Sequence, residues 1–190
     1  LLARPAATLA DASAGPPARG PGAPAPGDHV EPFDIIGSVA WMNAVLAHHA
    51  LRPLYDAEGL ALLLGELERK QELGVLQRLR VRDAHDRSLG WILYYLNPGG
   101  TSHVVQVGAR RGEFARVLAQ LIAHAWAGGA VALEGRVDPH DVGALARAEC
   151  SFSHDGPWVC GWTRDAAVRD AVLRGDIYLS RLECEWWTNF

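Results

Sequence analysis

Cysteine, long hydrophobic runs and excess positive charge are all scarce in this chain of 190 residues. The three cysteines (Cys150, Cys160 and Cys184) form no C-x-x-C pair, and their odd number argues against a disulfide framework, so we expect a reducing, cytoplasmic setting. No apolar run approaches the roughly 18 residues that a membrane-spanning helix needs, so we expect no membrane partner. The formal net charge is -4 and no basic stripe dominates, so nucleic acid is not an expected partner either.

The N-terminal segment lacks hydrophobic periodicity. Residues 1–27 contain nine Ala, six Pro and four Gly, a composition that cannot bury enough apolar surface to offset the entropy of ordering. We therefore predict a disordered linker over residues 1–30 and one folded domain over residues 31–190. The chain starts at Leu1 rather than Met, which is typical of a fragment or a processed product, and the linker would then follow a partner domain.

Hydrophobic periodicity in the rest of the chain predicts two helices, a meander of three strands, and then alternating helices and strands. The predicted helices cover residues 34–51, 56–73, 112–127, 139–148 and 165–174. The predicted strands cover residues 75–83, 89–96, 102–107, 130–137, 150–153, 158–163 and 177–187. This order predicts an α+β (mixed α/β) fold with a central mixed sheet.

The segment 102–127 is the most informative one. The strand Ser-His-Val-Val-Gln-Val leads through a basic, glycine-containing turn at 108–112 into a strongly amphipathic helix. The first N–H groups of a helix have no intrahelical partners, and the positive end of the helix dipole lies there. Because Arg110 and Arg111 add charge to the same turn, this unit predicts a phosphate or pyrophosphate site.

The hairpin, the strand 102–107, the basic loop, the helix 112–127 and the strand 130–137 together resemble the GNAT superfamily of N-acetyltransferases, over about residues 34–190. The resemblance implies a GNAT-like acyl-CoA N-acyltransferase fold with helices on both faces of the sheet, and one half of a tandem bacterial member is an alternative. It also implies a first strand before the two helices, which we expect upstream of Leu1 or in a partner domain.

The resemblance implies acetyl-CoA or another acyl-CoA as co-substrate, and no metal. In that superfamily the strand before the loop splays from its neighbour and binds the pantetheine arm, while the loop pattern Gln/Arg-x-x-Gly-x-Gly/Ala wraps the pyrophosphate. Gly112 matches the central glycine of that pattern, whereas Ala109 and Phe114 depart from it on either side. The implied cofactor-binding residues are Val105, Gln106, Val107, Ala109, Arg110, Arg111, Gly112, Glu113 and Phe114.

Acyl transfer from a thioester to an amine needs a base, polarisation of the carbonyl and a proton for the leaving thiolate. The backbone N–H of Val107 is the candidate for polarisation. Glu134 lies on the strand after the crossover helix, where family members often place a carboxylate, and is the candidate base; a solvated residue, or one paired with Arg136, is the alternative. Tyr94 and Tyr95 are candidates for protonating the thiolate or lining the acceptor pocket, and core packing of at least one is the alternative.

Other polar clusters are better explained without a ligand. Asp138 is expected to cap a helix rather than to share a metal ion with His140 and Asp141. His103 begins the candidate cofactor strand, where local hydrogen bonding is the simpler interpretation. Buried thiols are the simpler interpretation of the cysteines.

Three functions are open at this stage. The first is an N-acyltransferase that moves an acetyl or other acyl group to an amine of a small-molecule or protein acceptor. The second is a non-catalytic GNAT-like half-domain with a structural or acyl-CoA-binding role, or a Fem-type aminoacyl transferase half, and Trp186 and Trp187 would supply its domain or homodimer contact. The third is another α+β domain whose Arg110–Arg111 loop binds a different anion.

Overall fold

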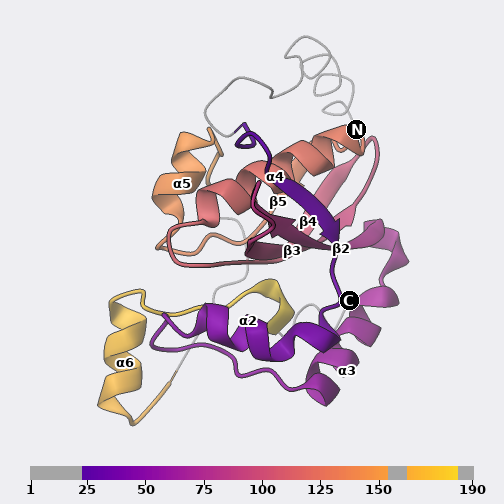
Figure 1. The fold of residues 1–190 in the computed structure, drawn as a ribbon. Coiled ribbons are helices and arrows are strands. Elements are labelled where there is room, and N and C mark those ends of the chain that lie inside the picture. The colour runs from indigo at the N-terminus through magenta and orange to yellow at the C-terminus, as the bar shows by residue number, and fades with distance from the viewer. Residues whose placement is uncertain (1–22, 154–161, 184–190) are drawn as a thin grey trace.

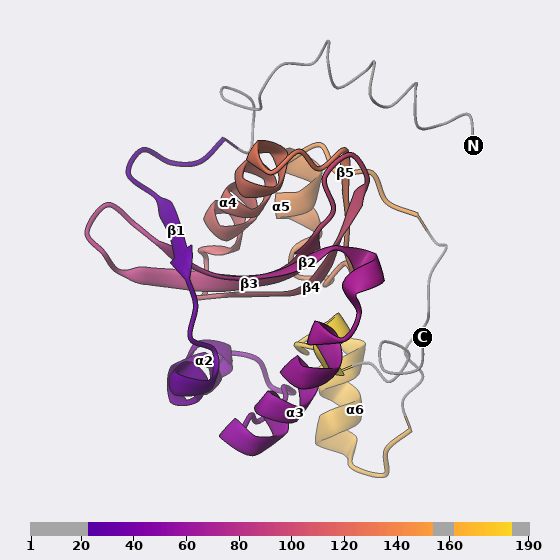
Figure 2. The same ribbon diagram turned by 90° about the vertical axis from the view of Figure 1, so that its right-hand side faces the viewer.

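The protein is described from a computed structural model, which covers residues 23–153 and 162–183. A five-stranded mixed sheet forms its centre (Figures 1 and 2). Its strands are β1 (His29–Pro32), β2 (Val75–Arg82), β3 (Ser88–Leu96), β4 (Thr101–Ala109) and β5 (Ala132–Glu134). They lie side by side in chain order; β1 to β4 are antiparallel and β5 is parallel to β4. The predicted α+β class with a mixed central sheet is confirmed.

Helices cover both faces of the sheet, as Figure 2 shows with the sheet seen on edge. On one face lie α4 (Phe114–Ala127) and α5 (Val142–Arg147). On the other side lie α2 (Val39–Leu46), α3 (Ala57–Glu68) and α6 (Ala166–Leu173). Three short 3₁₀ helices complete the described elements: η1 (Ile36–Ser38), η2 (Gln71–Leu73) and η3 (Arg181–Glu183).

Each face of the sheet has its own hydrophobic core. The first core joins α2 and α3 to Trp91 and Leu93 of β3, and the second joins α4 to Ile92 and Tyr94 of the same strand. Since alternate side chains of a strand point to opposite faces, β3 is buried on both sides and is apolar along nearly its whole length. β4 pairs with this buried strand, so β3 anchors one edge of β4 in the centre of the domain.

Two predicted strands on the C-terminal side are wrong. Residues 150–153 form no strand, and of residues 177–183 only Ile177 makes an isolated bridge, with Leu51, before η3 begins. The remainder of the last predicted strand, including Trp186 and Trp187, lies outside the described residues, as does most of the strand predicted over 158–163.

The prediction that the first strand of the sheet lies outside this chain is also wrong. β1 lies within the chain and pairs with the end of β2, so this strand comes neither from upstream of Leu1 nor from a partner domain. Its four residues, His-Val-Glu-Pro, give no apolar alternation by which the sequence could reveal them. β1 begins ahead of the predicted boundary at residue 31.

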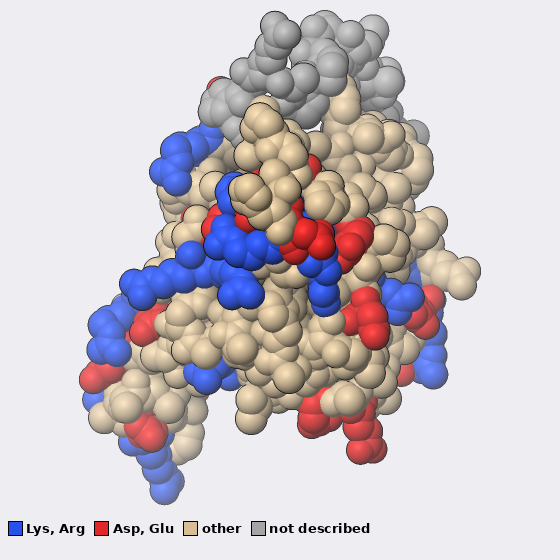
Figure 3. All heavy atoms as spheres, in the orientation of Figure 1, with Lys and Arg blue, Asp and Glu red and all other residues tan. Residues whose placement is uncertain are grey.

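The surface in Figure 3 carries basic and acidic side chains close together across the middle of the molecule, and a wide area below them carries neither. Ion pairs among the described residues include Arg82 with Glu31 and Arg78 with Glu68. Among the described residues, no helix combines the length and the apolar character that crossing a membrane requires.

Candidate functional site

Strand β4 loses its neighbour β5 partway along its length. The two strands pair through three residues each, and the pairing stops at His103 and Glu134. Next to this point the β3–β4 register shifts by one residue, which leaves Val105 as an extra residue on β4. Such a bulge bends its strand and increases the local twist. Residues 104, 106 and 107 stay paired with β3 on one side, while β5 does not cover their other edge; we call this separation of β4 from β5 the splay.

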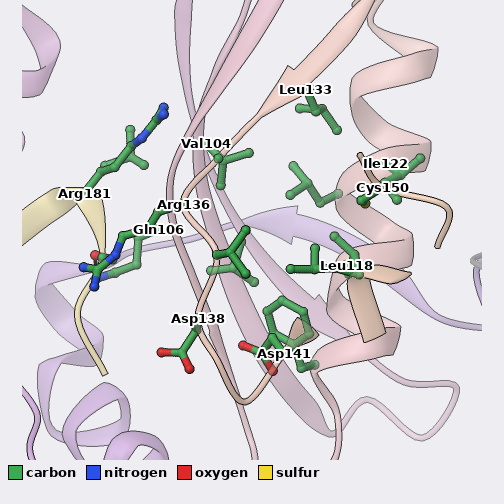
Figure 4. A pocket seen from close by; sticks show the side chains of 18 of the residues that line it. Val104, Gln106, Leu118, Ile122, Leu133, Arg136, Asp138, Asp141, Cys150 and Arg181 are labelled. Carbon is green, nitrogen blue, oxygen red and sulfur yellow. Dashed lines mark hydrogen bonds between the residues drawn. The ribbon is translucent and has the colours of Figure 1, made fainter. Parts of the chain in front are cut away.

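A pocket of about 170 Å³ opens along this edge, between β4, α4 and the segments that follow β5 (Figure 4). Asp138 and Asp141 lie together at one end, whereas Leu133 and Ile122 lie toward the other. The residues that line it come from four parts of the chain: Val104, Val105, Gln106 and Val107; Phe114, Leu118, Leu121 and Ile122; Leu133, Gly135, Arg136, Val137, Asp138, Asp141, Leu145, Cys150, Ser151 and Phe152; and Tyr178, Leu179, Ser180 and Arg181.

Tyr178 reaches the free edge of β4 directly. Its hydroxyl donates a hydrogen bond to the backbone carbonyl of Val107, with an O–O distance of 3.0 Å. Next to it, the guanidinium of Arg136 donates to the carbonyl of Leu179 at 3.0 Å. Burial raises the pKa of Tyr178 well above its usual value, so the hydroxyl keeps its proton. Sequence reasoning missed Tyr178, because it placed this residue in an ordinary terminal strand.

Gln106, which also lines the pocket, is the centre of a buried polar network that joins β4 to Trp91 and to the segment 178–183. Its Oε1 accepts from Nε1 of Trp91 at 2.7 Å, and its Nε2 donates to the hydroxyl of Tyr55 at 2.7 Å. The same Nε2 donates to Oγ of Ser180 at 3.0 Å and to Oε1 of Glu183 at 3.1 Å. The side chain of this β4 residue thus holds the 178–183 segment against the sheet.

Glu134 lies where β4 and β5 separate. Nη2 of Arg181 donates to its Oε1 at 2.7 Å, and Nδ1 of His103 lies 4.0 Å from its Oε2. The partner is thus Arg181 rather than the expected Arg136. Arg181 lines the pocket and Glu134 does not, so the carboxylate stands at the narrow end of the splay, beside the pocket.

Tyr94 and Tyr95 point to opposite faces of β3, and both are fully buried. The Tyr94 hydroxyl is 2.7 Å from Nδ1 of His124, and the Tyr95 hydroxyl donates to the carbonyl of Leu67 at 2.7 Å. Burial raises the pKa of Tyr94 to about 12 and raises that of Tyr95 as well. The structure brings neither tyrosine to the pocket.

The loop between β4 and α4 directs its two arginines differently. Nε of Arg110 donates to the carbonyl of Ser88 at 2.7 Å, and its guanidinium carbon is 6.0 Å from the centre of the Trp41 ring, on the α2 side of the sheet. Arg111 is exposed, and Gly112 has a φ of 83°, a conformation that favours glycine. Arg110 is exposed as well but is engaged with Ser88 and Trp41, so Arg111 is the loop cation that these contacts do not hold.

The residue that precedes α4, Glu113 at its N-cap position, already places a carboxylate at this helix terminus. Glu113 pairs with Arg87 at 2.9 Å and with Arg116 at 3.1 Å, and Arg116 also pairs with Asp28. A negative side chain is favoured at a helix N-terminus, and here it takes two of the nearby cations. Of the predicted cofactor residues, Val105, Gln106, Val107 and Phe114 line the pocket, whereas Ala109, Arg110, Arg111, Gly112 and Glu113 lie outside it.

Asp138 caps a turn rather than a helix. Its Oδ1 accepts from the amide of His140 at 3.0 Å, and α5 begins only after Asp141. Burial raises the pKa of both aspartates, that of Asp141 to about 7 with the Asp138 charge as the second cause. In residues 23–153 and 162–183, no three His, Cys, Asp or Glu side chains are grouped so that they could hold a metal ion.

No protein-family model matches this chain. No curated protein sequence matches it either. Among solved structures, the chain is similar to an acetyltransferase from Trypanosoma brucei, with 11% sequence identity and a TM-score of 0.47. The match covers 71% of this chain and 99% of that one. A likeness of this extent assigns neither a family nor an activity to the chain.

Proposed function

We propose that this protein is an N-acyltransferase that binds acyl-CoA along the free edge of β4 and transfers the acyl group to an amine. The observation that carries the proposal is the bulge at Val105, which coincides with the end of β4–β5 pairing and with the pocket. An extended, amide-containing arm can continue a sheet at such an edge, because exposed backbone groups bond it as they would a further strand. The pantetheine arm of CoA has this chemistry.

The phosphates of CoA would lie at the N-terminus of α4. Amide groups in its first turn point outward and the helix dipole favours negative charge there. Arg111, which is exposed in the preceding loop, supplies a cation. Since Arg87 and Arg116 are already paired with Glu113, Arg111 is the residue on which we expect phosphate binding to depend.

The transfer step uses groups around the splay. The amine nitrogen attacks the thioester carbon, the amine gives its proton to Glu134, and the C–S bond breaks as Tyr178 protonates the leaving thiolate. The raised pKa of Tyr178 keeps its hydroxyl protonated, so it enters this step as a hydrogen-bond donor. The N–H of Val107 points to the same edge as its carbonyl and is placed to polarise the thioester carbonyl.

Calorimetry with CoA and acetyl-CoA tests the binding step. The variant Arg111→Ala removes charge-assisted bonds to phosphate, so we expect its Kd to rise about tenfold or more. Arg110→Ala is the matched control, because Arg110 bonds Ser88 on the α2 side, and its Kd should stay near that of the unmodified protein. Absence of CoA binding at millimolar concentration would refute the proposal.

Release of free CoA with a panel of amines tests the chemistry. Tyr178→Phe should lower kcat by about a hundredfold or more while the Kd for acyl-CoA changes little, because the hydroxyl acts on the leaving group. Glu134→Gln should lower kcat and alter its pH dependence. An unchanged pH profile in Glu134→Gln would show that Glu134 is not the base.

The second candidate is a domain that binds acyl-CoA without turning it over. The ion pair of Glu134 with Arg181 favours it, because the proposed base is already engaged and does not line the pocket. This candidate predicts measurable CoA binding with no thiol release for any amine. For the partners of the protein we propose a small-molecule or protein amine if it is the acyltransferase, and a partner domain or a second copy of the chain if it is the non-catalytic domain.

A further inference from the structure

The pocket has a distinctly apolar inner end. Val104, Leu133, Ile122 and Cys150 form its walls toward β5 and α4, whereas Arg181 lies on the other side of Val104 and pairs with Glu134. Burial raises the pKa of the Cys150 thiol, so it stays neutral and adds to the apolar wall. Figure 4 shows the carboxylates of Asp138 and Asp141 at the opposite end.

The direction of α4 fixes the direction in which an acyl-CoA would enter. Ile122 lies toward the apolar end in Figure 4 and Leu118 nearer the carboxylates, so the start of α4 at Phe114, where the proposed phosphate-binding loop ends, lies toward the carboxylate end. The thioester would then lie near the bulge at Val105, and whatever follows the thioester carbonyl would point toward Leu133 and Ile122. An acetyl group has only a methyl to place against these walls.

The size of the pocket limits what can fill it. Its volume is about 170 Å³. An apolar cavity of about 150 Å³ in another protein admits benzene, a molecule of six carbons. Because this is the volume of the whole pocket, which must also hold the thioester, about six carbons is the upper limit for the acyl group, and a fatty acyl chain does not fit.

We infer that the site prefers an acyl group of about four to six carbon atoms, which would occupy the apolar inner end of the pocket beneath the splay of β4 and β5. This inference rests on the proposed acyl-CoA function and names its acyl donor. Burying one methylene is worth about 0.8 kcal/mol, which is about a fourfold gain in affinity. Two further carbons should therefore lower the Kd by roughly an order of magnitude relative to acetyl-CoA.

The experiment measures Kd by calorimetry for CoA, acetyl-, butyryl-, hexanoyl- and dodecanoyl-CoA. We expect butyryl-CoA to bind about tenfold and hexanoyl-CoA about a hundredfold more tightly than acetyl-CoA, and dodecanoyl-CoA to show no gain beyond hexanoyl-CoA. The variant Ile122→Trp fills the inner end and should remove the gain for hexanoyl-CoA while CoA itself binds as before. Ile122→Ala enlarges the same space and should move the optimum to a longer chain.

Leu62→Trp is the matched control, because Leu62 is 67% exposed on α3, away from the pocket, and this change should leave the chain-length series unaltered. Circular dichroism and thermal melting verify that each variant is folded. Equal Kd values across the series, with CoA still bound, would overturn the inference and leave the proposed function standing. Failure of every CoA compound to bind would overturn both.

Discussion

Replacing Gln106 by Leu tests whether the buried network described above holds the structure together. Gln106 is 2% exposed and Trp91 is completely buried, so the indole N–H of Trp91 would lose its acceptor with no water to replace it. A buried polar group left without a partner costs about 1–3 kcal/mol. Tyr55 and Ser180 keep their bonds to Glu183, so the loss should stay near 2 kcal/mol rather than grow with every broken bond.

Urea denaturation followed by tryptophan fluorescence measures this loss. A change of about 2 kcal/mol corresponds to a fall in Tm of about 4–8 °C for a domain of this size. Gln77→Leu on β2 is the matched control, because the Gln77 side chain makes only an exposed contact with the carbonyl of Val75. If Gln106→Leu and Gln77→Leu lower the free energy of unfolding equally, the network does not contribute as the structure indicates.

Two further predictions concern close packing and pH. A Cβ on Gly108 would lie 2.1 Å from the buried Trp91 ring, so Gly108→Ala should lower the free energy of unfolding by about 1–3 kcal/mol. Gly65→Ala, in α3, is the control: no atom lies within 4 Å of the added carbon, so this change should raise the free energy of unfolding by up to about 1 kcal/mol. Urea denaturation of both variants measures these changes, and the reverse order of stability would contradict the prediction. The pKa of Asp141 is about 7 in the folded protein against 3.8 as its ordinary value, so the folded state binds the proton more tightly and this contribution to stability is lost as the pH rises through 7. Asp141→Asn should therefore be more stable than the unmodified protein at pH 8, by about 1 kcal/mol after allowance for solvent screening. At pH 4 the two proteins should be nearly equal in stability. Thermal melts that show the same difference at both pH values would refute this prediction.

Long periodic segments were predicted well, because their burial pattern is local. The helix α4 repeats apolar residues at three- and four-residue steps, and the structure buries that stripe against β3 and β4. The hairpin of β2 and β3 was likewise recognised from its polar turn and from the long apolar run that β3 buries on both faces. Val105, Gln106 and Val107, which belong to the segment 102–127 that the sequence singled out, line the pocket.

Features that depend on long-range contacts were not predictable. The alternating Ile-Tyr-Leu-Ser over 177–180 is typical of a strand, but Glu183 accepts from the amide and the hydroxyl of Ser180, and Ser180 accepts from the amide of Leu182. Such side-chain bonds compete with a strand ladder and turn the backbone into η3. Likewise, nothing in the loop sequence indicates that Arg110 turns toward Trp41 while Arg111 stays exposed, because Trp41 is distant in the chain.

The short pairing between β4 and β5 affects the order in which the strands of the sheet form during folding. β2, β3 and β4 are contiguous in the chain and can pair early, whereas β5 must wait until the intervening α4 has formed and packed. With only three residues on each strand, β5 is also the part of the sheet that should open at the lowest free energy. The amides of β5 should therefore exchange with solvent hydrogen long before those of β3. During folding, the edge of β4 on which the proposed chemistry depends would form before β5 pairs with it.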